Sequence, residues 1–388
     1  MRFEFATATR ILFGPGTLQD VGPLAAEMGK RAFVLTGSST ERASPLLKQL
    51  AKHKIESVTF QVPSEPTVTL AQEAAAKARQ ASSDMVIAIG GGSPIDVGKV
   101  VAALITNSGE LNEYLEVVGD AKPLKIPSAP YIAIPTTAGT GAEVTKNAVL
   151  AVPEHKVKVS MRSPLLLPRM AIVDPVLTHL LPPALTASTG LDALTQLIEA
   201  YVSNKANPLT DAICRDGLVR VARSLLRAYE NGGDANARED MSLASLFSGL
   251  ALANAGLGAV HGLAAALGAT IPASHGVICG RLLPFVLEAN IRALKTRQCD
   301  SPVLTRFDEI AHLLTGIPAA RAANAVRWTY RLCSDLNIQP LGDFRLMEQD
   351  ISVVAAKAVK SSSMKGNPIE LQEEELIKIL KNAASKDI

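Results

Sequence analysis

The chain has 388 residues, of which 47% are hydrophobic and 20% are charged, a composition typical of a globular protein with two domains. Its formal net charge is only +2, it contains no Lys- or Arg-rich run, and 4% of its residues are aromatic. We therefore expect no nucleic-acid partner. The four cysteines form neither a CxxC pair nor a zinc-knuckle pattern, which indicates reduced thiols in a cytoplasmic protein.

Two segments bear on whether the chain enters a membrane. The first residues, MRFEFATATRILFG, contain no apolar run of signal-peptide type, so we expect no secretion signal. No Asp, Glu, Lys or Arg occurs from Met241 to Gly280, a length that would suit a membrane span. This stretch nevertheless contains Asn254, Pro272 and two histidines, and a lipid-facing helix would be richer in Leu, Ile, Val and Phe. We expect buried core helices here and no membrane contact.

Strand and helix signals alternate through the first half of the chain. Short apolar runs predict strands at 31–37, 84–93, 131–137 and 170–175, and a helical pattern lies among them at 69–82. Apolar strands joined by helical crossovers predict a parallel sheet covered on both faces. From about Ala184 the pattern changes to long apolar-periodic helices. With Pro182-Pro183 as the boundary, the predicted fold is α/β, a Rossmann-like domain over 1–182 followed by an all-α domain over 183–388.

The segment VIAIGGGSPIDVGK runs from a predicted strand through three glycines into a helix. Ser93 suits the N-cap, Pro94 the first helical position and Asp96 the first turn. Such a loop either cradles a phosphate with backbone N–H groups or is an ordinary tight turn. A second loop, IPTTAGTGAEVTKNAV at 134–149, follows another strand of the same sheet. Two loops at the carboxyl ends of neighbouring strands would converge on one crevice, which favours a nucleotide site.

The apolar helical segment TGLDALTQLIEAYVS, residues 189–203, carries two polar side chains one turn apart, Asp192 and Gln196. Burying a carboxylate is costly unless a partner offsets its charge. We therefore expect Asp192 to face a cation or a water-filled cavity.

Six motifs resemble, in the same order, those of the iron-containing alcohol dehydrogenase family: GGGSPIDVGK, PTTAGTGAEVT, AIVDP, TGLDALTQLIEAYVSNKANPLTD, HGLAAALGATIPASHG and NPIELQEEEL. The resemblance covers essentially the whole chain. It implies a dehydroquinate synthase-like architecture and an NAD(P)-dependent alcohol dehydrogenase, or aldehyde or ketone reductase, that transfers hydride. It also implies a divalent metal held by the helical domain and a homodimer with an added inter-subunit strand.

The resemblance assigns cofactor roles to residues of the first domain. Gly91, Gly92 and Ser93 would hold the pyrophosphate, with Asp96 in the same loop; Thr136, Thr137 and Thr140 would line the nicotinamide end; Asn147 and Lys158 would lie near the nicotinamide ribose. Lys158 is also a catalytic candidate, and the alternative for it is a solvated charge on an edge strand.

The residues after the first apolar run bear on the choice between NAD and NADP. A carboxylate there hydrogen-bonds the adenosine ribose and repels a 2′-phosphate. Gly37 stands where NAD-preferring relatives tend to carry Asp, and Ser38, Ser39 and Arg42 offer donors to a phosphate. We expect NADP as the preferred cofactor, with NAD as the alternative.

The resemblance also implies a metal site on Asp192, Gln196, His261 and His275, with Asp192 and the two histidines as catalytic residues. Gln196 stands where relatives carry a histidine ligand. An amide oxygen suits Mg, Mn or Ca better than zinc, so occupancy by iron or zinc stays open. Gln196 is then either a weak fourth ligand or a buried hydrogen-bonder that satisfies Asp192.

A second departure from the family pattern is Ala265, where relatives often carry a histidine that relays a proton. General acid work then falls to metal-bound water, to Lys158 or to solvent, and the site has room for a bulkier substrate. Two other functions stay open. One is reduction of an oxo-acid such as maleylacetate, with Arg162, Lys156 and Lys158 as carboxylate contacts. The other is a nucleotide-binding protein whose catalysis has decayed.

Overall fold

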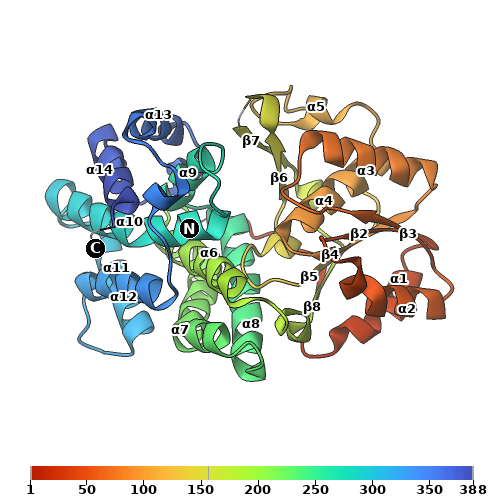
Figure 1. Cartoon of the computed structure of the whole chain (residues 1–388), viewed down its shortest axis with the longest axis horizontal. Coiled ribbons are helices and arrows are strands. Elements are labelled where there is room, and N and C mark those ends of the chain that lie inside the picture. Colours follow the sequence, from red (N-terminus) through yellow and green to blue (C-terminus); the bar gives the residue numbers. More distant parts are fainter. Residues whose placement is uncertain (1, 156, 387–388) are drawn as a thin grey trace. The chain divides into compact units, whose positions relative to one another are not determined.

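The computed structural model describes residues 2–155 and 157–386. The chain forms two compact units, Ala6–His179 and Leu180–Ile388, the latter including Met1–Phe5. In Figure 1 the first unit runs from red to yellow and the second from green to blue.

A six-stranded parallel sheet forms the centre of the first unit, with the strand order β1-β8-β5-β4-β2-β3. Its strands are β1 (Arg10–Phe13), β2 (Arg31–Thr36), β3 (Glu56–Gln61), β4 (Met85–Gly90), β5 (Tyr131–Pro135) and β8 (Met170–Val173). The four strands predicted from apolar runs are confirmed as β2, β4, β5 and β8. An antiparallel hairpin of β6 (Asn147–Val152) and β7 (Val157–Arg162) completes the strands of this unit.

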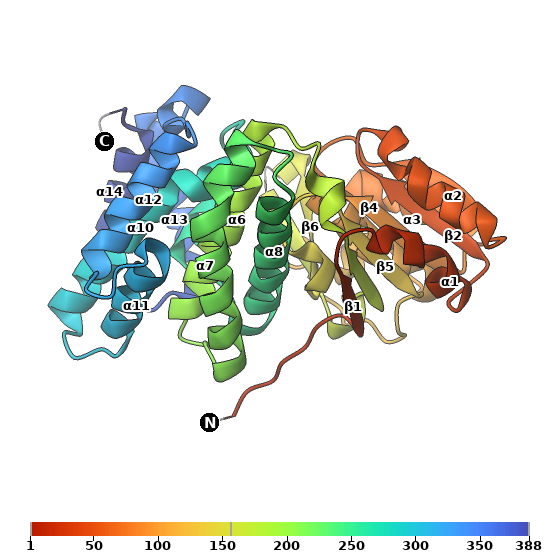
Figure 2. The ribbon, with the colours of Figure 1, turned by 90° about the horizontal axis from the view of Figure 1, so that it is seen from below.

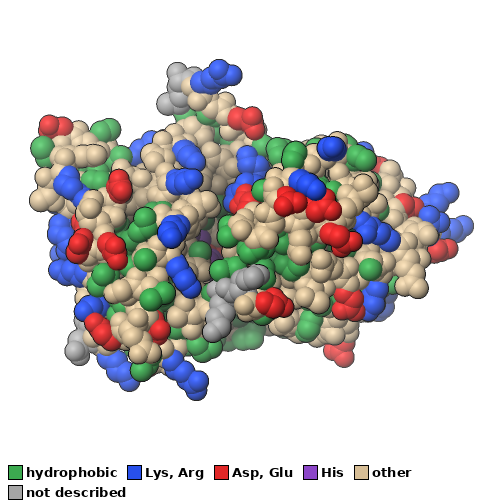
Figure 3. Space-filling model, turned by 90° about the horizontal axis from the view of Figure 1, so that it is seen from above, with side chains coloured by type: hydrophobic (Ala, Val, Ile, Leu, Met, Phe, Trp, Pro, Cys, Tyr) green, Lys and Arg blue, Asp and Glu red, His purple; other side chains and the backbone are tan. Residues whose placement is uncertain are grey.

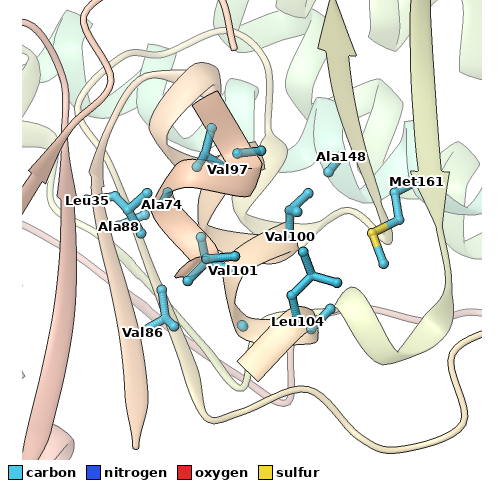
Figure 4. Packing of buried hydrophobic residues seen from close by; sticks show 14 of the residues in the cluster. Leu35, Ala74, Val86, Ala88, Val97, Val100, Val101, Leu104, Ala148 and Met161 are labelled. Atoms are coloured by element: carbon cyan, nitrogen blue, oxygen red, sulfur yellow. The ribbon is translucent and has the colours of Figure 1, made fainter. Parts of the chain in front are cut away.

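Helices cover both faces of the parallel sheet, as the apolar runs predict. They are α1 (Val21–Ala26), α2 (Ser44–Lys52), α3 (Val68–Gln80), α4 (Gly92–Thr106) and the short α5 (Leu111–Tyr114). On one face, α3 and α4 pack on Leu35, Val86 and Ala88. Figure 4 shows Val100 and Val101 of α4 in this cluster. On the other face, α1 and α2 pack on the alternate strand residues, in a second apolar cluster.

The predicted start of α4 is wrong by two residues. Gly91 is its N-cap and the helix begins at Gly92, so Ser93 and Pro94 lie inside the first turn and Asp96 beyond it. The physical reason is that β4 runs through Gly90, and the chain turns directly from strand to helix on two glycines.

The second unit is all-helical from Pro183 onward within the described residues, as predicted. Figure 2 shows α6, α7 and α8 side by side, which agrees with their extensive packing. The helices are α6 (Pro183–Val202), α7 (Pro208–Glu230), α8 (Ala235–Ala255), α9 (Ala259–Leu267), α10 (His275–Arg297), α11 (Val303–Thr315), α12 (Ala322–Asp335), α13 (Glu348–Val359) and α14 (Glu373–Ala384). Parallel sheet followed by helices is the predicted fold class, which is confirmed.

The uncharged stretch from Met241 to Gly280 forms the end of α8, all of α9 and the start of α10. Across the described residues, no single helix has the length and apolarity to cross a membrane, although α8 and α9, bent by 99°, meet that test as a pair. Most side chains of both helices are buried within the unit, which suits core helices.

Charged side chains of both signs are interspersed over the face drawn in Figure 3. This mixture accords with the small net charge of the chain.

Candidate metal centre and nucleotide loops

Four potential metal ligands meet in the second unit. Asp192 lies on α6, His261 on α9, and His275 and Cys279 on the first two turns of α10. One ligand atom from each lies within 4.8 Å of the others. The structure thus brings together Asp192, His261 and His275 of the predicted metal site, places Gln196 against Asp192, and adds Cys279, for which the sequence predicts only a reduced thiol.

The geometry of the predicted ligands fits a transition-metal ion. His261 Nε2 lies 3.2 Å from Asp192 Oδ1, and His275 Nε2 lies 3.7 Å from the same oxygen. Metal–ligand bonds of about 2.0–2.1 Å in a tetrahedral arrangement separate N and O donors by about 3.3 Å. The His275 side chain is 41% exposed whereas those of Asp192 and His261 are buried, so a ligand reaches the cluster from the His275 side.

Neighbouring charges shift the pKa values of the ionisable groups in this cluster. Burial alone would raise the pKa of Asp192, but His275 and His261 bring it below its ordinary value. Burial alone would lower the pKa of His261, but Cys279, Asp192 and Glu199 raise this pKa well above its ordinary value. Burial likewise raises the pKa of the Cys279 thiol, and the two imidazoles outweigh it. The neighbouring charges therefore favour the ionised forms of Asp192 and Cys279.

Glu199, which no sequence motif singles out, fixes the orientation of His261. Its Oε2 lies 2.7 Å from His261 Nδ1, and its Oε1 accepts a hydrogen bond of 2.6 Å from Val260 N at the start of α9. A carboxylate suits the positive end of the α9 dipole. A Cβ on Gly258, the α9 N-cap, would lie 2.9 Å from Glu199 Oε1, so glycine lets the carboxylate approach. Such a pairing leaves Nε2 as the metal-binding atom.

Gln196 makes hydrogen bonds to two neighbouring side chains in the core. Its Oε1 accepts a hydrogen bond of 2.8 Å from Ser248 Oγ on α8, and its amide donates to the Asp192 carboxylate. The amide oxygen thus points to α8, while the amide nitrogen faces Asp192. This arrangement favours the alternative that Gln196 is a hydrogen-bonder supporting Asp192.

Two glycines let α10 approach α6 closely enough to form the cluster. A Cβ on Gly276 would lie 1.9 Å from the carbonyl oxygen of Ser188, and one on Gly280 would lie 2.5 Å from the Leu191 side chain. These glycines stand one turn apart on one face of α10 and flank Cys279. Contact at the level of the backbone brings the α10 ligands within reach of Asp192.

In the first unit, the two glycine-containing loops lie side by side. β4 and β5 pair in parallel up to Gly90 and Pro135, and Thr136 N donates to Gly90 O at 2.9 Å. A Cβ on Gly92 would lie 3.1 Å from the Thr140 side chain, and one on Gly91 would lie 3.5 Å from Thr137. The loops therefore meet at the N-terminus of α4, where backbone N–H groups suit a phosphate.

Asp96 and the neighbouring Lys99 are joined within the first unit. The fully buried Lys99 ammonium contacts Asp96 Oδ1 at 3.1 Å, Thr145 Oγ1 at 2.8 Å and the Asn147 carbonyl oxygen at 2.7 Å. Asp96 Oδ2 accepts a hydrogen bond from Val149 N. Asp96, a predicted cofactor residue, thus anchors α4 to β6 and positions Asn147 through Lys99.

The structure separates Lys158 from Asn147. The hairpin pairs Asn147 with Arg162 and Ala151 with Lys158, so the two predicted ribose contacts lie about 13 Å apart along the strands. Lys158 forms an ion pair with Glu65. With its side chain 17% exposed, Lys158 is thus a paired charge on the hairpin and not the solvated one of the alternative.

The predicted adenosine-end residues directly follow β2. Gly37 and Ser39 precede a short 3-10 helix, Thr40–Ala43, and the Ser38 carbonyl accepts a hydrogen bond from Gln61 Nε2. A Cβ on Gly37 would meet no atom within 4 Å. Arg42 is exposed, as a phosphate contact requires.

Comparison with known proteins identifies relatives of the whole chain. The family model for the iron-containing alcohol dehydrogenases matches residues 8–175, and the model for the C-terminal part of the Fe-containing alcohol dehydrogenase family matches 186–384. The chain is 35% identical to 1,3-propanediol dehydrogenase of Klebsiella pneumoniae, covering 98% of each chain, and 33% identical to the NAD-dependent methanol dehydrogenase of Bacillus methanolicus, covering 96% and 97%. A solved 1,3-propanediol oxidoreductase superposes with a TM-score of 0.92 at 34% identity, covering 99% of this chain and 100% of the other.

Proposed function

The chain belongs to the iron-containing alcohol dehydrogenase family and is an oxidoreductase acting on alcohols or aldehydes, and from that premise we propose that it prefers NADP(H) and works with a divalent metal at Asp192, His261 and His275. The observation that carries this proposal is the convergence of these three donors, from three helices, at separations that suit a metal.

The chain's own residues prepare the site for a carbonyl group. Asp192 and His261 are held by Gln196 and Glu199, so their donor atoms are fixed before any ligand arrives. A bound divalent metal would act as a Lewis acid and polarise the carbonyl oxygen toward hydride addition. The side chain of His275 is partly exposed and leaves an approach for the substrate oxygen.

On the nucleotide side, we assign the pyrophosphate to Gly91, Gly92 and Ser93 at the N-terminus of α4. The dipole of this 15-residue helix and its first N–H groups favour an anion there. Thr137 and Thr140 lie beside the glycines and offer hydroxyl groups to the same phosphates.

The proton of the product alcohol comes from solvent in this proposal. Ala265 lies exposed on α9, one turn after His261, and carries no group that transfers a proton. Lys158, the other candidate, is engaged by Glu65. The small side chain of Ala265 also supports a substrate larger than a short unbranched aldehyde.

The NADP preference rests on Gly37 and Arg42. No side-chain carboxylate stands at Gly37 to repel a 2′-phosphate, and Arg42 is exposed within the following turn. Glu41 adjoins Arg42 and is also exposed, so it opposes part of this attraction.

The two alternative functions have less support. For an oxo-acid reductase, Arg162 is paired with Glu116 and Lys158 with Glu65, and Lys156 lies outside the described residues. For a decayed enzyme, the preserved donor cluster would have no purpose. We also propose, from the family resemblance and the cysteine usage, a homodimer in the cytoplasm.

Steady-state kinetics test the proposal. Purified protein supplemented with Zn²⁺ or Fe²⁺ should oxidise NADPH in the presence of short, branched or aromatic aldehydes, with a higher kcat/KM for NADPH than for NADH. NADPH binding without turnover of any aldehyde, ketone or alcohol would instead support the decayed enzyme.

A further inference from the structure

We propose that Cys279 is the fourth protein ligand of the metal, in place of Gln196, and that the resulting Asp192–His261–His275–Cys279 site selects zinc. This inference rests on the proposed function because it concerns the same metal centre. It goes further by moving the fourth ligand from α6 to α10 and by changing its chemistry from an amide oxygen to a thiolate.

The distances from the Cys279 sulfur to the two histidines suit a shared metal ion. Cys279 Sγ lies 3.6 Å from His275 Nε2 and 3.9 Å from His261 Nε2. In a tetrahedral zinc site, with Zn–S near 2.3 Å and Zn–N near 2.05 Å, sulfur and nitrogen are about 3.6 Å apart. The sulfur thus stands at a fourth corner beside Asp192 Oδ1, and small shifts of the side chains complete the tetrahedron.

The position of Cys279 on α10 also suits a metal ligand. It follows His275 by four residues, so both side chains leave the helix on one face, one turn apart. The close contacts of Gly276 and Gly280 with α6 fix this face against Asp192. The same backbone placement that brings His275 to the cluster therefore also brings Cys279.

The hydrogen bonds of Gln196 argue against this residue as the fourth ligand. Its side-chain oxygen lies 2.8 Å from Ser248 Oγ, and its amide nitrogen is a donor that faces Asp192. To become a ligand through its oxygen, Gln196 would have to turn its amide over and present its NH₂ group to Ser248 inside a packed core. Cys279 needs no such rearrangement.

The other three cysteines differ from Cys279 in their surroundings. Cys333 donates a hydrogen bond to the Gly280 carbonyl, Cys214 is buried on α7, and Cys299 is exposed. None of the three belongs to the described group of potential metal ligands. Cys279 alone of the four thus faces imidazole and carboxylate donors.

The ligand set decides the metal. A thiolate with two imidazoles and one carboxylate suits zinc, whereas an amide in the fourth place would favour harder ions. On binding, the Cys279 thiol forms a sulfur–metal bond and releases its proton to solvent, without oxidation or reduction. A substrate oxygen would then join as a fifth ligand.

Cobalt substitution tests the proposal on the full-length chain. Co²⁺ bound to a thiolate shows an intense sulfur-to-metal charge-transfer band in the near ultraviolet, which nitrogen and oxygen ligands do not produce. We expect this band at one equivalent of Co²⁺, its loss in Cys279→Ser, and its retention in Gln196→Ala and in the control Cys299→Ser. Zn²⁺ affinity should fall by more than about 100-fold in Cys279→Ser, because a direct ligand outweighs the outer-shell effects of 10–100-fold.

X-ray absorption on the zinc-loaded wild-type protein keeps the test independent of whether a variant folds. One sulfur at about 2.3 Å from zinc supports the proposal. One bound metal without sulfur scattering and without the cobalt band overturns it, while leaving the proposed metal-dependent activity intact. NADPH-dependent turnover by a protein that binds no metal overturns both the fourth ligand and the metal, but not the hydride transfer.

Discussion

His261 Nδ1 lies 2.7 Å from Glu199 Oε2, and Glu199 stands two helical turns after Asp192 on α6. One helix therefore provides both a ligand of the candidate metal and the carboxylate that orients a second ligand. Because Glu199 also accepts the Val260 N–H, it joins the start of α9 to α6.

Replacing Glu199 by Gln tests this relationship. Glu199 now faces the backbone N–H groups of Val260 and His261 and the His261 Nδ1, and an amide, with one acceptor oxygen, would turn an NH₂ group toward part of this set. We expect metal affinity to fall by about 10–100-fold, as for other outer-shell partners of histidine ligands. Competition titration with a chromophoric chelator measures this, with the exposed Glu239→Gln on α8 as control. Equal zinc affinity in Glu199→Gln and wild type would show that Glu199 serves the fold alone.

Gly276→Ala should damage both the fold and the metal centre. Its Cβ would lie 1.9 Å from a backbone carbonyl, so α10 must move away from α6. We expect the free energy of unfolding to fall by about 3 kcal/mol or more, with weaker metal binding because His275 is adjacent. Urea denaturation followed by circular dichroism measures the first effect. In the control Gly217→Ala the nearest atoms to the new Cβ belong to the flexible Leu197 side chain, at 2.8 Å, so it should cost less; equal losses would refute the backbone argument.

Gly37→Asp should change the cofactor preference. A Cβ at this position would meet no atom within 4 Å, so we expect the substitution to leave the fold intact. The new carboxylate would accept from the adenosine ribose and repel a 2′-phosphate. Hydrogen bonds to charged groups contribute about 1.5–3 kcal/mol, so the ratio of kcat/KM for NADPH to that for NADH should fall by about 10–100-fold. An unchanged ratio would place the adenosine end elsewhere.

Glu143 should make the stability of the chain depend on pH. Its burial raises the pKa to about 7 from an ordinary value of 4.5, although its own backbone N–H and Lys99 oppose this. The folded state therefore binds more protons than the unfolded state between these values. Stability is full below about pH 4.5 and falls as pH rises through about 7.

The variant Glu143→Gln removes this ionisation. Between about pH 5 and about pH 8, wild type should lose up to about 3 kcal/mol relative to the variant, from a shift of about 2.5 pKa units. Urea titrations across this range measure the difference. A constant difference between the two proteins at all pH values would contradict the raised pKa of Glu143.

The central strands of the first unit could be predicted because each is buried on both faces and reads as a continuous apolar run. β3 could not be predicted in this way because it is an edge strand in which only Phe60 is buried. Capping preference predicts Ser93 as the N-cap of α4 and Pro94 as its first residue. The structure instead turns at Gly90, whose φ of 159° favours glycine, and Gly91 is an N-cap without a side-chain hydrogen bond.

Two residues of the candidate metal centre, Cys279 and Glu199, have a spacing in the sequence that points to the site. Cys279 was judged by its lack of a CxxC partner, although its spacing of four from His275 is a ligand spacing on a helix. Glu199 follows Asp192 by seven residues, which places it on the same helix face. That His261 comes to lie between these two carboxylates depends on how α9 packs on α6, and no local pattern contains that information.

Metal content per subunit, measured by elemental analysis together with NADPH-dependent aldehyde reduction before and after EDTA, tests the central claim most directly. We predict close to one equivalent of metal, loss of activity when EDTA removes it, and recovery when Zn²⁺ or Fe²⁺ is added back. Undiminished activity in metal-free protein would contradict the account and would mean that Asp192, His261 and His275 orient the substrate by hydrogen bonds alone.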